Sequence, residues 1–208
     1  MGKMDEQIIV VNRALLFTGN KGSDLTFQGT EQSGDSISEM EHNMARHYQV
    51  MRRGDAEENP EYKQPIPYAV LHRGNHFFTY TRLGGGGEKR LHGRLSVGVG
   101  GHMNQAAGAD DFHQVLNVNL RREIDEELNI TGVNRLDLRT IGLINDDATE
   151  VGRVHIGVLI SIELPDSATV SVREKDKLAG AWMTLDELTA KKEKMESWSV
   201  FAVDVLSR

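Results

Sequence analysis

The sequence predicts an α+β fold in which a mixed β-sheet is flanked by helices. Strand-like segments come first, then one amphipathic helix, then more strands and closing helices, which is the order of an α+β or mixed-sheet domain. Residues 154–164 are apolar on both faces of a strand, so we expect this strand in the middle of the sheet. Large apolar residues recur every fourth position through the central helix: Phe112, Leu116, Leu120, Ile124 and Leu128.

Composition excludes several classes of protein. The 208 residues fit one domain with an extension, or two small domains. With 24 basic and 31 acidic residues the net charge is −7, which argues against general nucleic-acid binding. There are no cysteines, so disulfides, thiolate metal sites and cysteine nucleophiles are absent. No stretch approaches the roughly 20 apolar residues of a membrane span, and no signal peptide is visible. We therefore expect a cytoplasmic protein.

The N-terminal part is expected to be an extension. Four segments are predicted in order: a strand over 7–17, a loop over 18–36, an amphipathic helix over 38–53 and a polar, proline-containing linker over 54–67. The methionines of the helix, Met40 and Met44 among them, are interpreted as packing residues rather than as a binding groove. A domain boundary is placed near residue 64, which leaves 1–64 as the extension and 65–208 as the main domain.

A hairpin opens the main domain. Residues 67–73 and 75–82 are apolar and aromatic around Arg73-Gly74-Asn75, which is typical of two strands joined by a tight turn. Four glycines at 84–87 follow, and they indicate a flexible loop because no P-loop lysine comes after them. Basic residues then cluster and could either meet a phosphate group or lie on the surface as solvated charge: Lys89, Arg90, His92 and Arg94.

The segment before the central helix has features of a binding loop. Residues 94–99 alternate as a strand does and lead directly into Gly100-Gly101-His102, where two glycines permit close approach of a ligand to the backbone. Asp110 or Asp111 is expected to cap the helix, with Gln114 at the third helical position. Asn129 follows the helix, where a left-handed residue is often found.

Acidic residues gather on one side of this helix. Glu123, Glu126 and Glu127 fall within an arc of about 100°. Their i,i+3 and i,i+4 pairs each disfavour the helix by about 0.2–0.5 kcal/mol, unless a divalent cation reverses the sign. A solvated charged face is the alternative. Arg122 precedes Glu126 in the poorer order for an ion pair, and Asp125 points away from the cluster.

The C-terminal part supplies the remaining strands and helices. Strands are predicted over 136–145 and 154–164, joined by a polar turn at 146–150 and followed by a short strand over 169–172. His155 is interpreted as a satisfied core histidine in preference to a ligand. Thr184 and Glu187 form a capping box at the start of a short helix, and a closing amphipathic helix begins at Ser197.

The glycine pair, the capped helix and its acidic face together resemble the Nudix family. That family's box reads G-x5-E-x7-R-E-U-x-E-E-x-G-U, and its second half is matched here by Arg122-Glu123-Ile124-x-Glu126-Glu127-x-x-Ile130. The resemblance covers roughly 65–208 and implies a Nudix-like α/β/α sandwich. Three features depart from the pattern. Gln114 replaces a box glutamate, Asn129 replaces the last glycine, and the loop before the helix is seven residues longer.

The resemblance implies a metal-dependent hydrolase that cleaves a pyrophosphate bond in a small nucleoside diphosphate derivative. By this resemblance, the residues that would bind Mg²⁺ or Mn²⁺ are Glu123, Glu126 and Glu127. The expected catalytic residues are Glu126, Glu127, Arg122 and Glu150, and the expected substrate contacts are Gly100, Gly101 and Arg94. A homodimer is expected from the family.

Two alternatives remain open. Gln114 and the N-terminal extension leave room for a nucleotide-binding sensor with weak or no catalysis. An isomerase-like reaction on the same fold would require a cysteine, which the chain lacks.

Overall fold

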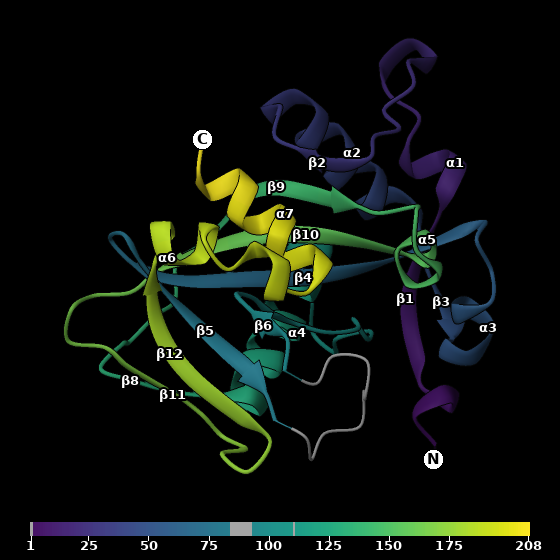
Figure 1. Cartoon of the computed structure of the whole chain (residues 1–208). Coiled ribbons are helices and arrows are strands. Elements are labelled where there is room, and N and C mark those ends of the chain that lie inside the picture. Colours follow the sequence, from purple (N-terminus) through teal and green to yellow (C-terminus); the bar gives the residue numbers. More distant parts are fainter. Residues whose placement is uncertain (1, 84–92, 110) are drawn as a thin grey trace. The chain divides into compact units, whose positions relative to one another are not determined.

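The computed structural model describes residues 2–83, 93–109 and 111–208 (Figure 1). The glycines at 84–87, three basic residues after them (Lys89, Arg90 and His92) and Asp110 lie outside the described residues. The chain divides into two compact units. The first unit comprises Met1–Pro67, Gly101–Arg121 and Gly142–Val158, and the second comprises Tyr68–Gly100, Arg122–Ile141 and Leu159–Arg208.

The first unit is built on strand β1 (Gln7–Asn12), whose residues from Ile8 to Val11 are fully buried. This strand pairs antiparallel with β3 (Tyr48–Arg52) and with the beginning of β4 (Tyr62–Arg73). β2 (Gly29–Glu31) pairs with the end of β9 (Leu138–Asn145). The helices that lie wholly within this unit are α1 (Arg13–Leu16), α2 (Gly34–His47), α3 (Arg53–Glu57) and α5 (Glu150–Val154), with 3-10 turns at Lys3–Asp5 and Asn20–Gly22. Most of α4 (Phe112–Glu127) also belongs to it.

Several N-terminal predictions were wrong in their boundaries. The strand expected over 7–17 ends at Asn12, because the Asn12 side chain accepts the Leu15 N–H at 3.2 Å and caps α1. The loop expected over 18–36 contains β2 and the start of α2. The helix expected over 38–53 ends at His47, and the chain continues as β3 because β1 supplies backbone partners there.

The segment expected to be a linker is structured. Residues 54–67 contain most of α3 and the beginning of β4, where Lys63 and Gln64 are fully buried. The proposed boundary at residue 64 falls within β4, and the division into 1–64 and 65–208 stays a prediction. Met40 and Met44 are fully buried, which confirms their interpretation as packing residues.

The second unit contains the predicted hairpin. β4 leads through Gly74, at φ 49°, into β5 (His76–Arg82). β12 (Leu178–Thr184) pairs antiparallel with β5 along its whole length, and the two strands lie side by side in Figure 1. The other elements are the short strands β6 (Leu95–Ser96) and β7 (Val99–Gly100), the pair β8 (Leu128–Thr131) and β11 (Thr169–Val172), α6 (Leu185–Thr189), a 3-10 turn (Lys192–Lys194) and α7 (Ser197–Leu206).

The sheet is mixed, which confirms the predicted α+β fold class. Strands hydrogen-bond in the order β12-β5-β4-β10-β9-β2, so β10 (His155–Glu163) lies between two other strands, as its apolar sequence predicts. Lys63 at the start of β4 hydrogen-bonds to His155 at the start of β10, and His72 near the end of β4 accepts from Leu164 just after β10. β4 and β10 therefore run parallel, whereas β5 and β12 run antiparallel.

Helix α4 (Phe112–Glu127) carries the predicted apolar stripe. All five stripe residues are at most 5% exposed, and the fifth, Leu128, lies just beyond the helix at the start of β8. Asp111 caps the helix, because its carboxylate accepts the Gln114 N–H at 2.8 Å. The left-handed conformation expected at Asn129 was wrong. Asn129 lies in β8 and pairs with Ser171 of β11, and this pairing draws the chain from helix directly into strand.

Candidate active site

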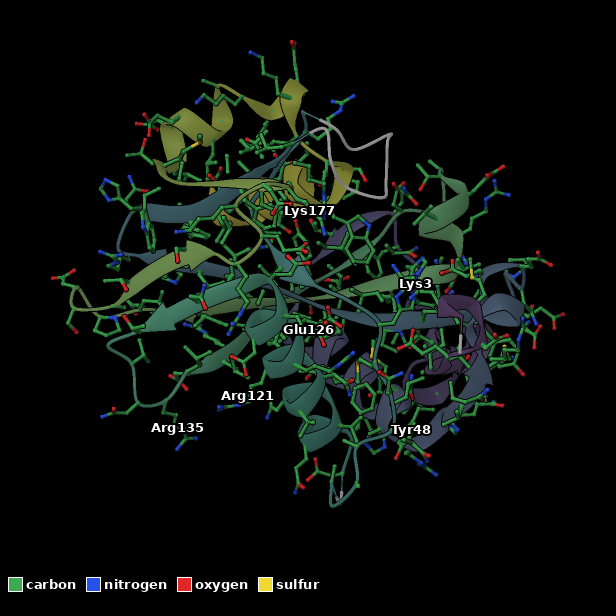
Figure 2. The ribbon with its side chains drawn as sticks, turned by 90° about the horizontal axis from the view of Figure 1, so that it is seen from below. Lys3, Tyr48, Arg121, Glu126, Arg135 and Lys177 are labelled. Carbon is green, nitrogen blue, oxygen red and sulfur yellow. The ribbon has the colours of Figure 1, made fainter. Side chains whose placement is uncertain are left out.

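The acidic face of α4 is organised by Arg122. Its Nη2 lies 2.9 Å from Glu123 Oε1, and its Nη1 lies 3.9 Å from Glu126 Oε1. The side chain of Glu126 is 60% exposed, whereas that of Glu123 is 13% exposed. Figure 2 shows Glu126 on the teal helix α4. The guanidinium thus lies beside two of the three predicted metal ligands and reduces their mutual repulsion.

Glu127 is the most unusual carboxylate on this face. Its Oε2 is buried and has no hydrogen-bond partner among the residues that the structure describes. Burial raises the pKa of Glu127 to about 7, even though the Arg82 guanidinium and the neighbouring Tyr80 hydroxyl favour the charged form, and Glu123 and Glu196 raise it further. A buried oxygen without a partner is costly, so this position can accept a proton or a cation.

Three residues around Glu127 were missed by sequence reasoning. Tyr80 and Arg82 come from β5, and Glu196 is the N-cap of α7. Arg82 Nε donates to Glu196 Oε1 at 2.9 Å, and the Tyr80 hydroxyl donates to the Gly98 carbonyl at 3.0 Å. Alternation along β5 could have placed Tyr80 and Arg82 on one face of the strand. No local signal joins that face to Glu196.

The two substrate-contacting residues predicted in the second unit, Gly100 and Arg94, are both held by hydrogen bonds. Gly100 lies in β7 and pairs with Tyr68 of β4. The strand expected over 94–99 forms two short strands, because the Val97 N–H is bonded to the Ser199 hydroxyl at 3.1 Å instead of to a neighbouring strand. Arg94 donates to the carbonyls of Glu193 at 2.9 Å and Met195 at 3.5 Å, which fixes its guanidinium.

Gly101 and Glu150 belong to the first unit. Glu150 is exposed and opens the short helix α5. Thr149 caps this helix by accepting the Gly152 N–H at 3.0 Å, so the turn expected at 146–150 ends in a helix start. The roles predicted for both residues stay predictions.

A second group of potential metal ligands lies in the first unit. The donor atoms of Glu57, His102 and His155 all lie within 4.8 Å of one another. A hydrogen bond from His102 lowers the pKa of Glu57 to about 2, while burial lowers the pKa of His155 to about 4. Glu57 is therefore a carboxylate and His155 a neutral imidazole near neutral pH. His155 is buried and hydrogen-bonded, as a core histidine would be, but its cluster was missed by sequence reasoning.

Within the described part of the chain, no helix is long and apolar enough to cross a membrane. A scan against protein-family models found no match.

Two comparisons place the chain among known proteins. Protein YmaB of Bacillus subtilis (strain 168) is 48% identical over 208 residues, which cover 99% of this chain and 100% of YmaB. The crystal structure of Tm1382, described as a putative Nudix hydrolase, superposes with a TM-score of 0.78 at 27% identity, covering 97% of this chain and 98% of Tm1382. The shared fold therefore includes most of the N-terminal segment.

A third comparison shows the fold alone. DR0079 from Deinococcus radiodurans has a TM-score of 0.51 at 17% identity and covers 70% of this chain and 83% of that protein. The chain thus belongs to the family of protein YmaB and has the fold of the Nudix hydrolases.

Proposed function

We propose that this protein is a metal-dependent hydrolase that cleaves a pyrophosphate bond in a nucleoside diphosphate derivative. The observation that carries the proposal is the buried Oε2 of Glu127, which has no partner in the described part of the chain and lies among other carboxylates on α4 of a Nudix fold. The resemblance of Tm1382, itself described as a putative Nudix hydrolase, supports the same reaction class.

The acidic face fits a hard divalent cation. Glu123, Glu126 and Glu127 would hold Mg²⁺ or Mn²⁺, since these ions prefer carboxylate oxygens. Such an ion would satisfy the buried Oε2 of Glu127, which no described residue does. When bound, it supplies polarisation of phosphoryl oxygens and a lowered pKa for a bound water.

The remaining roles fall to the chain's own side chains. Arg122 positions Glu123 and Glu126 through its two contacts. Glu126, which is exposed, or Glu127 accepts a proton from the attacking water, and Glu150 is the candidate from outside the helix.

The substrate contacts are proposed outside α4. The backbone of Gly100 and Gly101 and the side chain of Arg94 contact the substrate. A pyrophosphate is itself anionic, so cations must accompany it to an acidic site. A cytoplasmic location and a homodimer stay predictions.

The proposal is tested by incubating the protein with Mg²⁺ or Mn²⁺ and separate nucleotide sugars, dinucleoside polyphosphates, NADH, ADP-ribose and nucleoside triphosphates. Products are separated by ion-exchange chromatography. We expect one class to be cleaved at its pyrophosphate bond, and the product sizes identify the substrate.

Charge-matched variants assign the site. Glu126→Gln and Glu127→Gln should each lower kcat/KM by about 100-fold or more, since even residues that only support metal ligands contribute about 10–100-fold. Asp125→Asn removes the same charge from an exposed position of the same helix and should retain activity. Full turnover in both glutamine variants would overturn the site. Nucleotide binding that raises the melting temperature without any cleavage would favour the sensor function instead.

A further inference from the structure

The second group of donor atoms comes from three separate segments of the first unit. Glu57 ends α3, His102 follows the glycine pair, and His155 begins β10. The two histidine Nε2 atoms are 3.1 Å apart. Glu57 Oε1 lies 3.5 Å from His102 Nε2, and Glu57 Oε2 lies 4.0 Å from His155 Nε2. Three distant stretches of sequence therefore bring their donor atoms to one point.

These separations fit three corners of a tetrahedral metal site. Zinc binds imidazole nitrogen and carboxylate oxygen at about 2.0–2.2 Å, so neighbouring ligand atoms in a tetrahedron lie about 3.3 Å apart. The pair distances of 3.1 and 3.5 Å already match that edge. His155 Nε2 lies 4.0 Å from the other carboxylate oxygen, Oε2, so metal binding requires the Glu57 carboxylate to rotate until one oxygen faces both histidines.

The tautomer of His155 prepares it to bind a metal. Its Nδ1 lies 2.6 Å from the Val151 carbonyl oxygen, which can only accept, so Nδ1 carries the proton. Nε2 then presents a lone pair to the cluster. Metal-binding histidines almost always donate their other ring N–H to a carbonyl or carboxylate in this way.

The carboxylate of Glu57 is also paired with Arg53. Arg53 Nε lies 3.3 Å from Glu57 Oε1, and Arg53 Nη1 lies 3.3 Å from Glu6 Oε2. Arg53 thus contacts the same Glu57 oxygen that faces His102, and it orients this carboxylate as outer-shell partners orient metal ligands. The side chains of His155, His102 and Glu57 are 7%, 14% and 24% exposed, so the group is mostly buried but reachable from solvent.

We propose that Glu57, His102 and His155 form a binding site for a divalent transition metal of the zinc type. Two imidazoles and one carboxylate suit Zn²⁺ and its neighbours better than Mg²⁺, which prefers oxygen ligands. Three protein ligands leave a fourth position for water or another small ligand, the arrangement of catalytic rather than structural zinc sites. The competing explanation is a hydrogen-bonded group in which His102 shares a proton with Glu57 and His155.

The ligands of this site are different residues from the carboxylates proposed to hold the cation of the hydrolase centre. Its ligands belong to the first unit, whereas Glu123, Glu126 and Glu127 belong to the second. Variants of one group can therefore be compared with variants of the other, and failure of either proposal leaves the other testable.

The test measures metal binding to untagged, chelator-treated protein. Zn²⁺ is titrated by calorimetry, and Co²⁺ is added as a spectroscopic probe because tetrahedral Co²⁺ has intense visible bands. With excess Mg²⁺ present to occupy the carboxylates of α4, we expect one tightly bound Zn²⁺ per chain and a tetrahedral Co²⁺ spectrum. His102→Asn and Glu57→Gln should each weaken Zn²⁺ binding by at least tenfold and abolish that spectrum.

Two control variants separate the site from other binding. His113→Asn removes an exposed histidine from α4, and Glu126→Gln removes a carboxylate of the proposed hydrolase site. Both should bind Zn²⁺ as the wild type does. Circular dichroism checks that each variant is folded. Retained Zn²⁺ affinity in folded His102→Asn, or no stoichiometric Zn²⁺ on the wild type, would overturn the proposal in favour of the hydrogen-bonded group.

Discussion

Lys63→Met is the most informative test of how the first unit is held together. The Lys63 side chain is fully buried, and its ammonium group meets three acceptors. Nζ lies 2.8 Å from Asp147 Oδ1, 2.8 Å from the Gly152 carbonyl and 3.2 Å from the His155 carbonyl. Methionine keeps the length and apolar volume of the side chain but donates no hydrogen bond, so the substitution isolates the polar contribution.

The expected loss is about 3 kcal/mol. Burial lowers the pKa of Lys63 to about 8, so the ammonium itself carries a desolvation cost that methionine removes. Against this, the carbonyls of Gly152 and His155 each lose the ammonium as a donor, and a buried acceptor left unsatisfied costs about 1–3 kcal/mol. The Gly152 carbonyl still accepts the His155 N–H, so its loss is the smaller of the two. Asp147 loses less, because it is 27% exposed and keeps Arg13 and the Asn145 amide as partners. Removing one partner of a buried pair costs about 3–5 kcal/mol, and partial exposure of Asp147 puts this case at the lower end.

Urea denaturation followed by far-UV circular dichroism measures the difference. Lys63→Met should lower the unfolding midpoint clearly at unchanged slope. Lys177→Met is the matched control, because the Lys177 side chain is 39% exposed and pairs with Glu174 within the same surface turn. Its midpoint should not change. A Lys63→Met midpoint equal to that of wild type would refute the argument that the three acceptors depend on this ammonium group.

Two further substitutions test the second unit's acidic site and the turn before β10. Glu127→Gln should raise the melting temperature of chelator-treated protein at pH 8 and change it little near pH 4. The pKa of Glu127 in the folded protein, about 7, lies above the usual 4.5 of a glutamate, so its favourable contribution is present below about pH 4.5 and is lost as pH rises through 7. A lower melting temperature at pH 8 would contradict that sign. Gly152→Ala should cost about 2 kcal/mol or more in a thermal melt, because the new Cβ would lie 1.9 Å from the Asp146 carbonyl oxygen. Gly34→Ala, whose Cβ would meet nothing within 4 Å, should melt no lower than wild type, and equal melts of the two variants would contradict the steric argument.

Local signals predicted the elements whose stabilising contacts are themselves local. The capping box of α6 was confirmed, because Thr184 Oγ1 accepts the Glu187 N–H at 3.3 Å and Glu187 Oε2 accepts the Thr184 N–H at 2.8 Å. The stripe of α4 was confirmed, because residues four positions apart lie on one face of a helix and these residues are buried. In both cases the evidence lies within one turn or a few turns of the same helix.

Predictions failed where a distant segment decides the conformation. Tyr48 and Met51 continue the helical spacing of α2, but they pair with Val11 and Ile8 of β1 across the sheet. The spacing of these apolar residues is compatible with a helix and with a strand, and only the presence of the partner strand β1 decides between the two. For the same reason the polar residues of 54–67 indicated a linker. Lys63 is in fact buried, because its ammonium group donates to acceptors about 90 positions later in the chain.

The candidate sites divide in the same way. Glu123, Glu126 and Glu127 could be named from sequence because one helix turn brings them together. Glu57, His102 and His155 could not, since the two histidines alone are separated by 53 positions and meet only in the folded chain. Their side chains carry no motif that would join them beforehand.

Two carboxylates of this chain show why the α4 site is better explained by a ligand than by stability. Burial alone would raise the pKa of Asp147, but hydrogen bonds from Arg13, Lys63 and Asn145 hold it well below its usual range, so its charge is satisfied by the fold. Glu127 has the opposite shift, has other acids nearby and leaves one buried oxygen without a partner among the described residues. The chain can evidently build a satisfied carboxylate, and it does not do so at Glu127. A cost of this kind persists where function requires it, and a cation at the acidic face of α4 would remove it.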